Sequence, residues 1–271
     1  MRSLSDRLVR AQRPIRILDA VKWDHAVERA FFAAGCRELP HVTRAYYQAR
    51  PLAFDLQQKT DEFKALESDI RRQIGACDAP GQIMTRMCKE YRDALHMLTL
   101  RGTPAFSRWS AKLYGSTREV AGERGRVSAP SEAPSTGQPL LRLWAGAAPE
   151  RPALDKTLNA QETVDALAKR LQGYFQDSVK VRVRLSDGIL ADAAAGCGYI
   201  KIRGSARFTL QDLRLLEVHE GWVHLGTSLN GQSQPICTFL SKGSPTSTVT
   251  QEGLAVLTEV ATSASHPARM R

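Results

Sequence analysis

Two histidines that bracket a glutamate stand close together in the second half of the chain. His219, Glu220 and His224 belong to the segment 219–224, which reads HEGWVH. Imidazoles are common zinc ligands, and a hydrolytic zinc needs three protein ligands and one open position for water. Glu220 follows the first histidine, where a carboxylate can take a proton from that water and return it to the leaving group. The segment therefore predicts a hydrolytic site that uses Zn²⁺ as its cofactor.

The third zinc ligand is expected from a second helix. Glu252 follows a loop rich in glycine and proline, and it stands where another helix is expected to begin. Gly253 beside it leaves room for the close approach of another backbone. We therefore expect His219, His224 and Glu252 to be the metal ligands.

The spacing of the histidines sets a requirement on the helix that carries them. Residues i and i+4 lie about 40° apart around a regular α-helix, whereas i and i+5 lie about 140° apart. His219 and His224 have the second spacing. A π-bulge absorbs one extra residue and recurs at functional sites, and Gly221 gives the backbone freedom there. The sequence predicts a bulge near residues 220–223.

A strand that precedes the histidines is a candidate for substrate binding. Residues 199–203 alternate between apolar and polar side chains, the period of a half-buried strand. An extended peptide can pair with such a strand if it lies at a sheet edge. Tyr199, Lys201 and Arg203 are then the candidate substrate-binding residues, with the two cations facing a substrate carboxylate. The alternative, that these charges only solvate the strand face, stays open.

The remaining pattern indicates an α+β chain that is mainly helical. Apolar residues recur at helical spacing in several stretches, and Thr209 and Asn159 are each followed three residues later by an acidic residue that can complete a capping box. The expected helices cover residues 54–75, 83–101, 104–114 and 159–175 and begin again near 209 and 250, and the expected strands cover 179–185 and 199–203. We expect a small sheet beside the zinc-binding helix.

Composition divides the chain into three parts. Residues 1–117 are predicted to form a basic helical region, residues 118–158 a linker or mobile loop rich in Ala, Pro, Gly, Ser and Arg, and residues 159–271 the region that carries the site. The formal net charge is +10, and most of the excess lies in the first half. A basic surface attracts polyanions without selecting one, so no specific nucleic-acid partner is predicted.

Two further features bear on the compartment. The N-terminal residues hold no continuous apolar stretch, so neither a signal peptide nor a membrane segment is expected, and the predicted location is the cytoplasm. The 5 cysteines show no CxxC spacing, which favours reduced thiols in the core over disulfides or metal ligands.

The paired motifs resemble a known family. HEGWVH at 219–224 together with TQEGLA at 250–255 resembles the QEGLA-motif proteins, a bacterial group named for presumed modulation of flavohaemoglobin expression and related to the eukaryotic microtubule-associated tyrosine carboxypeptidases. The resemblance extends over nearly the whole chain, through residues 84–91, 101–104, 187–193 and 238–243.

This resemblance implies a zincin-like fold and the same site. Carried over, the zinc ligands are His219, His224 and Glu252, and the catalytic base is Glu220. The relatives continue further beyond the QEGLA helix, so we expect this chain to lack part of the family's C-terminal portion.

Two functions are consistent with these residues. The first is a zinc metallopeptidase, a carboxypeptidase whose partner is the C-terminus of a peptide or protein. The second is a non-catalytic or regulatory metal-binding protein that influences gene expression, as the family's bacterial name suggests.

Overall fold

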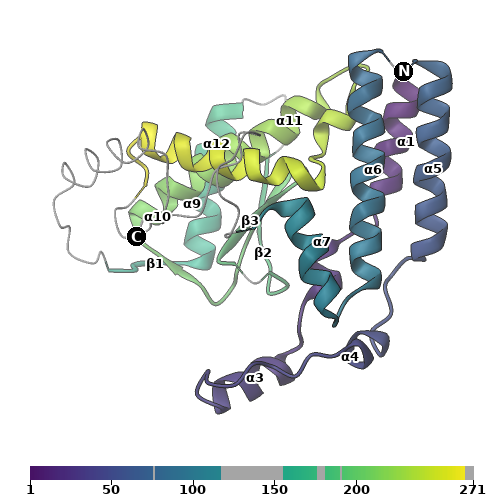
Figure 1. Ribbon diagram of the computed structural model, residues 1–271. Coiled ribbons are helices and arrows are strands. Elements are labelled where there is room, and N and C mark those ends of the chain that lie inside the picture. The colour runs from purple at the N-terminus through teal and green to yellow at the C-terminus, as the bar shows by residue number, and fades with distance from the viewer. Residues whose placement is uncertain (76, 117–154, 176–180, 190, 266–271) are drawn as a thin grey trace, which may run out of the picture. The chain divides into compact units, whose positions relative to one another are not determined.

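The chain forms two compact units, seen in a computed structural model (Figure 1) that describes residues 1–75, 77–116, 155–175, 181–189 and 191–265. The N-terminal unit comprises Met1–Gly115 together with the short segments Pro235–Phe239 and Gly243–Thr246. The C-terminal unit comprises the described parts of Ser116–Gln234, Leu240–Lys242 and Ser247–Arg271. Helices dominate both units and strands occur in the second, which confirms the expected α+β class.

All regular elements in the described part of the N-terminal unit before residue 116 are helices. They are α1 (Arg2–Gln12), α2 (Ile17–Val21), α3 (His25–Ala33), α4 (Arg44–Gln48), α5 (Leu56–Gln73), α6 (Ala79–Thr99) and α7 (Pro104–Tyr114). The predicted helices at 54–75, 83–101 and 104–114 are confirmed as α5, α6 and α7.

Helices α1, α5 and α6 pack side by side and enclose the core of this unit. The Phe63 ring of α5 stacks on the Tyr91 ring of α6, with centroids 5.3 Å apart. Asp55 caps α5 and Asp78 caps α6 through side-chain acceptors for backbone N–H groups, and Gly75 follows α5 with a φ of +97°. Both helices are therefore stabilised in two ways, by a capped N-terminus and by burial of one apolar face.

Short segments from later in the chain complete this core. Phe239 is 1% exposed, and its backbone N–H donates to Ser5 Oγ at 2.8 Å. The Tyr91 hydroxyl donates to the Gly243 carbonyl at 2.9 Å. Composition divides the chain into consecutive parts, so it did not predict that residues near 240 belong to the N-terminal unit.

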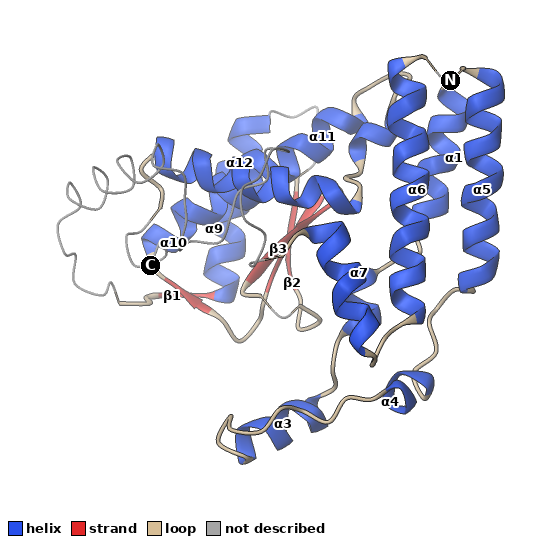
Figure 2. Ribbon diagram, in the orientation of Figure 1, coloured by secondary structure: helices blue, strands red, loops and turns tan. Residues whose placement is uncertain are grey.

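The C-terminal unit combines helices with short strands (Figure 2). Its described elements are β1 (Leu158–Asn159), α9 (Ala160–Phe175), β2 (Arg182–Leu185), β3 (Ala193–Gly196), β4 (Tyr199–Ile202), β5 (Arg207–Phe208), α10 (Leu210–Leu216), a π-helix η2 (Glu217–Leu225), α11 (Gly226–Gln232) and α12 (Thr248–Ala261). Two 3₁₀ turns, η3 (Thr238–Ser241) and η4 (Pro245–Ser247), precede α12. The predicted helices at 159–175, from 209 and near 250 correspond to α9, α10 and α12.

The three-stranded sheet has the order β2-β4-β3, with β4 parallel to β2 and antiparallel to β3. Ile200 and Ile202 of β4 are fully buried and share a core with Leu167 and Leu171 of α9. Strand β3 reads AAAG and has no apolar alternation, which is why the sequence did not predict it.

Most of the predicted linker, residues 118–154, lies outside the described residues. Before it, α7 ends at Gly115, which has a φ of +83°. Among the described helices, none has the length and apolar character that crossing a membrane requires.

Candidate metal centre

The two histidines of HEGWVH lie on the π-helix η2, which continues directly from α10. A capping box starts α10, with reciprocal hydrogen bonds between Thr209 and Asp212 of 2.8 and 2.9 Å. A π-helical turn holds more residues than an α-helical turn, so positions five apart return to the same side of the helix. The predicted bulge near residues 220–223 is confirmed, and it extends over Glu217–Leu225.

Gly221 allows this widened helix to approach α9. A Cβ atom on Gly221 would lie 2.4 Å from Leu171 Cδ2, closer than carbon atoms can approach. Leu171 is itself fully buried in the core of the C-terminal unit. A side chain at this position would therefore displace Leu171 or move η2 away from α9.

The structure brings His219, His224 and Glu252 together, with one ligand atom from each residue and all three atoms within 4.8 Å of one another. The Nε2 atom of His219 lies 3.5 Å from Glu252 Oε2, and the Nε2 atom of His224 lies 3.5 Å from Glu252 Oε1. The two imidazoles meet nearly edge to face, with centroids 4.8 Å apart. Glu252 on α12 thus lies beside the two histidines, in a position from which it could supply the third donor.

Burial differs across the cluster. The His219 side chain is 8% exposed and that of His224 is 18% exposed, whereas the Glu252 side chain is 56% exposed. The two histidines are therefore largely buried in the C-terminal unit, whereas Glu252 is open to solvent. A hydrolytic metal needs such an opening for water and substrate.

A buried glutamate contacts the ring nitrogen of His219 that does not face Glu252. Glu259 Oε1 lies 2.6 Å from His219 Nδ1, and Glu259 is fully buried. A carboxylate in this position accepts a hydrogen bond from Nδ1–H, so that the Nε2 lone pair faces Glu252 and would face a metal. Sequence reasoning missed Glu259. It stands seven residues after Glu252 on α12, and this spacing places the two on one face of a helix.

Glu220 lies on the same π-helix and faces strand β3. Its Oε2 atom accepts a hydrogen bond of 2.7 Å from the backbone N–H of Ala195. Among the described residues, its Oε1 atom has no hydrogen-bond partner. The carboxylate is therefore held at one oxygen and leaves the other available to a proton donor.

The donor set fits zinc. Zinc bonds to imidazole nitrogen and carboxylate oxygen of about 2.0–2.2 Å place neighbouring tetrahedral donors about 3.3 Å apart. Each histidine Nε2 lies 3.5 Å from a carboxylate oxygen of Glu252, His219 from Oε2 and His224 from Oε1, and one ligand atom from each residue can be chosen so that all three lie within 4.8 Å. Two imidazoles and one carboxylate leave a fourth position, and the Glu259 contact supplies the outer carboxylate typical of zinc-bound histidine.

The strand predicted to pair with substrate is not an edge strand. Strand β4, with Tyr199 and Lys201, pairs with β2 on one side and β3 on the other. The prediction of an edge at residues 199–203 was therefore wrong, because its backbone groups are already used in the sheet. Strand β3 lies at one edge of the three-stranded sheet; like β4 it contacts η2, and its Ala195 N–H donates to Glu220.

The side chains predicted to bind substrate, on β4 and directly after it, have partners within the chain. The Arg203 guanidinium pairs with Asp192, and the Arg203 backbone N–H donates to the Asp192 carbonyl at 2.8 Å. Arg184 and Lys201 both lie over the Tyr199 ring, at 5.1 and 5.6 Å from its centroid. Arg203 is thus engaged within the chain, while Tyr199 and Lys201 belong to a cationic face of the sheet.

Comparison with protein families identifies the group to which these residues belong. The sequence matches the family described as microtubule-associated tyrosine carboxypeptidase over residues 29–271, most of the chain. This chain belongs to that family. The matched residues include η2, β3 and α12, and the match confirms the expected relation to the tyrosine carboxypeptidases. Comparisons with curated proteins and with solved structures find no match.

Proposed function

We propose that this chain is a zinc-dependent carboxypeptidase that hydrolyses the C-terminal peptide bond of a peptide or protein. The observation that carries the proposal is the convergence of His219, His224 and Glu252, whose ligand atoms lie within 4.8 Å of one another. Membership of a carboxypeptidase family supports the reaction type. The donor chemistry supports zinc as the metal.

The proposed roles follow from the contacts of each residue. The two Nε2 atoms and the Glu252 carboxylate would hold the zinc, which supplies the Lewis acidity that activates water and polarises a carbonyl. Glu259 keeps the His219 proton on Nδ1, because its carboxylate is fully buried and lies 2.6 Å from that nitrogen. Its role is to position His219.

Glu220 is the proposed general base. The Ala195 N–H fixes its Oε2 atom, so Oε1 is the oxygen that takes the proton of the attacking water. The water oxygen adds to the scissile carbonyl carbon, the C–N bond then breaks, and Glu220 passes the proton to the departing amine nitrogen. One carboxylate therefore serves both proton transfers without a net change in its charge.

Substrate binding is proposed at the edge of β3 and the cationic face beside it. Strand β3 contacts η2, so a peptide paired with the part of its outer edge that the Ala195–Glu220 hydrogen bond leaves free would run close to η2. Lys201, two residues from Tyr199 on the neighbouring strand, is the proposed partner of the substrate's terminal carboxylate. Arg203 is the weaker candidate, because Asp192 already neutralises it.

The decisive experiment compares two neighbouring glutamates of η2. Zinc content and the release of C-terminal amino acids from a peptide library would be measured for wild type, Glu220→Gln and Glu217→Gln. Glu217 is a matched control because it is a buried glutamate of the same helix whose carboxylate pairs with Arg170 and Arg214, at 3.0 and 3.1 Å, and not with a histidine. We expect Glu220→Gln to keep its zinc and lose about 10²-fold or more in turnover, with Glu217→Gln active.

Other outcomes would reject parts of this proposal. Full turnover in Glu220→Gln would remove Glu220 as the base. Unchanged zinc content in His224→Ala or Glu252→Ala would remove that residue from the ligand set. Bound zinc without peptide hydrolysis by the wild-type chain would instead favour the regulatory metal-binding function.

A further inference from the structure

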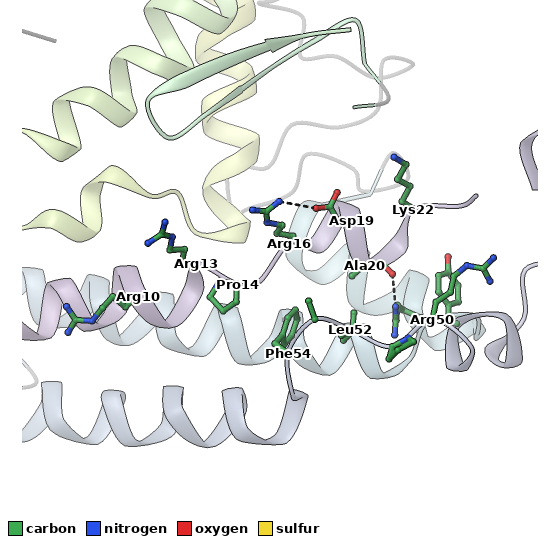
Figure 3. Close-up of a pocket in the computed structure, with 14 residues that line it drawn as sticks. Arg10, Arg13, Pro14, Arg16, Asp19, Ala20, Lys22, Arg50, Leu52 and Phe54 are labelled. Carbon is green, nitrogen blue, oxygen red and sulfur yellow. Dashed lines mark hydrogen bonds and ion pairs between the residues drawn. The ribbon is translucent and has the colours of Figure 1, made fainter. Parts of the chain in front are cut away.

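A cavity in the N-terminal unit gathers cations without bringing them to one point. It has a volume of about 770 Å³ and is lined by the end of α1, by α2 and by the segment between α4 and α5 (Figure 3). Arg13 and Lys22 lie at opposite ends of the lining and point apart, and Arg101 already donates to the Ala20 carbonyl at 2.7 Å. These cations therefore do not define one binding site.

The three-stranded sheet of the C-terminal unit does bring two cations together. Arg184 of β2 and Lys201 of β4 lie directly opposite each other in the register of these parallel strands. Neighbouring strands are about 4.8 Å apart, and opposed residues project from the same face of the sheet. The Arg184 guanidinium lies 5.1 Å and the Lys201 ammonium 5.6 Å from the centre of the Tyr199 ring. Both charges are therefore held beside one aromatic side chain.

The polar groups at this point are free to bind an anion. Among the described residues, the charged groups of Arg184 and Lys201 form no ion pair or hydrogen bond, and the Tyr199 hydroxyl forms no hydrogen bond. Two like charges side by side repel each other, and the electron-rich face of an aromatic ring offsets only part of that repulsion. The cluster of Arg184, Lys201 and Tyr199 is therefore complementary to a negatively charged group.

The Tyr199 ring leans from the central strand over β3, the edge strand. Gly196 of β3 is the register partner of Tyr199, and a Cβ atom on it would lie 2.4 Å from Tyr199 Cζ and 2.7 Å from the hydroxyl oxygen. The end of the ring therefore occupies the space that a side chain at position 196 would fill. The other residues of β3 are alanines, so no long side chain on this strand separates its outer edge from the cluster.

The cluster also lies close to the residue that holds Glu220. The backbone N–H of Ala195 donates to Glu220 Oε2 at 2.7 Å. Lys201 and Tyr199 are opposite the two residues of β3 on either side of Ala195. One residue of an extended strand spans about 3.3 Å. The terminal carboxylate of a peptide likewise lies one residue beyond the last peptide carbonyl, so a chain end placed for attack beside Glu220 would bring its carboxylate to the cluster.

We propose that Arg184, together with Lys201 and the Tyr199 hydroxyl, binds the α-carboxylate of the substrate's C-terminal residue. This inference rests on the proposed carboxypeptidase function, and it names the residue that restricts cleavage to chain ends. A guanidinium donates two parallel hydrogen bonds to a carboxylate, a geometry that an ammonium group does not offer. Arg184 thus takes the role that the sequence suggested for Arg203, whose charge Asp192 already neutralises.

Binding can be measured apart from turnover in the Glu220→Gln background. The probes are acetyl-tetraalanyl-phenylalanine and its C-terminal amide, titrated by calorimetry into the zinc-loaded full chain at fixed ionic strength. These peptides differ only in the terminal charge. We expect the free acid to bind about tenfold or more tightly than the amide, and Arg184→Gln to reduce this preference to less than about threefold.

Three further variants separate the carboxylate contact from general charge. Arg182→Gln is the matched control, because Arg182 is an exposed arginine of the same strand whose Nη2 atom lies 3.9 Å from the position of a Cβ on Gly198, at the turn after β3. It should keep the full preference for the acid. Arg184→Lys keeps the charge without the fork and should retain part of the preference, and Tyr199→Phe should lower it about threefold. Thermal unfolding would verify that each variant is folded.

Kinetics with the Glu220 carboxylate present tests the same contact during turnover. Arg184→Gln should raise KM about tenfold and change kcat less than about twofold, because the contact is the same before and during the reaction. Equal affinity of the wild-type site for acid and amide, the absence of binding at millimolar concentration, or equal losses in Arg184→Gln and Arg182→Gln would overturn the receptor. Hydrolysis that retains the acid preference in Arg184→Gln would reject this inference alone, whereas an Arg184-dependent preference without hydrolysis would reject only the proposed reaction.

Discussion

Glu259 Oε1 lies 2.6 Å from His219 Nδ1, and this contact joins the last long helix of the chain to its π-helix. The same helix carries Glu252, which faces the other ring nitrogen of His219 at 3.5 Å. One helix therefore contacts both sides of a single imidazole. The position of α12 therefore affects the proposed zinc site in two ways. Glu259 orients the His219 lone pair, and Glu252 is the proposed third donor.

Replacing Glu259 should weaken metal binding without removing a ligand. In Glu259→Gln a neutral amide replaces the carboxylate and stabilises the Nδ1 proton less, so we expect zinc affinity to fall about 10–100-fold. Competition with a chelator that reports free zinc would measure it. The buried Glu217→Gln variant is the control, since Glu217 pairs with arginines and should leave zinc affinity unchanged. Equal affinity in wild type and Glu259→Gln would show that the contact has no role in metal binding.

The packing of Gly221 against Leu171 gives a second prediction. Gly221→Ala should destabilise the chain by about 1–3 kcal/mol, because its Cβ would lie 2.4 Å from Leu171 Cδ2. Gly173→Ala is the control on α9, where a Cβ would meet nothing within 4 Å and should be neutral or stabilising. Urea unfolding would give both free energies.

A double mutant separates this clash from other effects of alanine. Leu171→Ala removes the clashing methyl groups, so Gly221→Ala should cost less in the Leu171→Ala background than in wild type. The same cost in both backgrounds would mean that the π-helix, and not the contact with Leu171, requires glycine at this position.

The sequence predicted the helices and the irregular turn better than it predicted the sheet. The spacing of His219 and His224 requires a widened turn if both are to face one ion, and this requirement alone indicated the π-helix. The periodic apolar residues of α5, α6 and α9 predicted those helices for the ordinary reason that one face is buried.

What the sequence could not predict depends on neighbours far away in the chain. Alternation in Tyr199–Ile202 indicates a strand but not whether the strand is central or at an edge, and β3 carries no alternation because three of its four residues are alanine. The Ala195 N–H that holds Glu220 is a backbone group, which no residue type reveals. Glu259 follows Glu252 by seven residues, a spacing that puts both on one face of α12. This spacing indicates a role for Glu259 only when His219 is known to lie between the two carboxylates.

Asp93 gives a prediction about pH and stability. Burial raises the pKa of Asp93, but hydrogen bonds from Lys89 and Lys112 at 3.0 and 3.1 Å outweigh it, and the net pKa is lower than the ordinary 3.8. A carboxyl with a lowered folded-state pKa stabilises the fold above its unfolded pKa, and this contribution is lost as the pH falls through the folded-state pKa. Asp93→Asn should therefore be destabilised at pH 7 by about 1 kcal/mol or less, since both lysines are half-exposed.

Unfolding by urea at neutral and acidic pH would test this dependence. The difference between wild type and Asp93→Asn should shrink as the pH falls below 3.8. Asp165→Asn, an exposed carboxylate on α9 whose partner is the neutral Gln161, is the control and should show little difference at either pH. A difference for Asp93→Asn that is independent of pH would assign its effect to packing between α6 and α7 and not to charge.

The cysteines test whether the core of the N-terminal unit is closed. All five thiols are free, but only Cys88 is buried, whereas Cys36 and Cys77 are exposed, so the prediction of core thiols was correct for Cys88 and wrong for these two. Burial, with a smaller contribution from the nearby Glu67 charge, raises the pKa of Cys88 to about 12. At pH 8 only about one in ten thousand of such thiols is ionised, and the thiolate is the reactive form.

Iodoacetamide should therefore modify Cys36 and Cys77 in the native chain at pH 8 and leave Cys88 unmodified until denaturant is added. Mass spectrometry of the digested chain would give the extent of reaction at each site, with the exposed cysteines as internal controls in the same sample. Because Cys88 lies on α6 among the buried residues shared with α1 and α5, its reaction requires these helices to separate. Modification of Cys88 at the rate of Cys36 in native conditions would contradict a closed core and show that α6 opens without global unfolding.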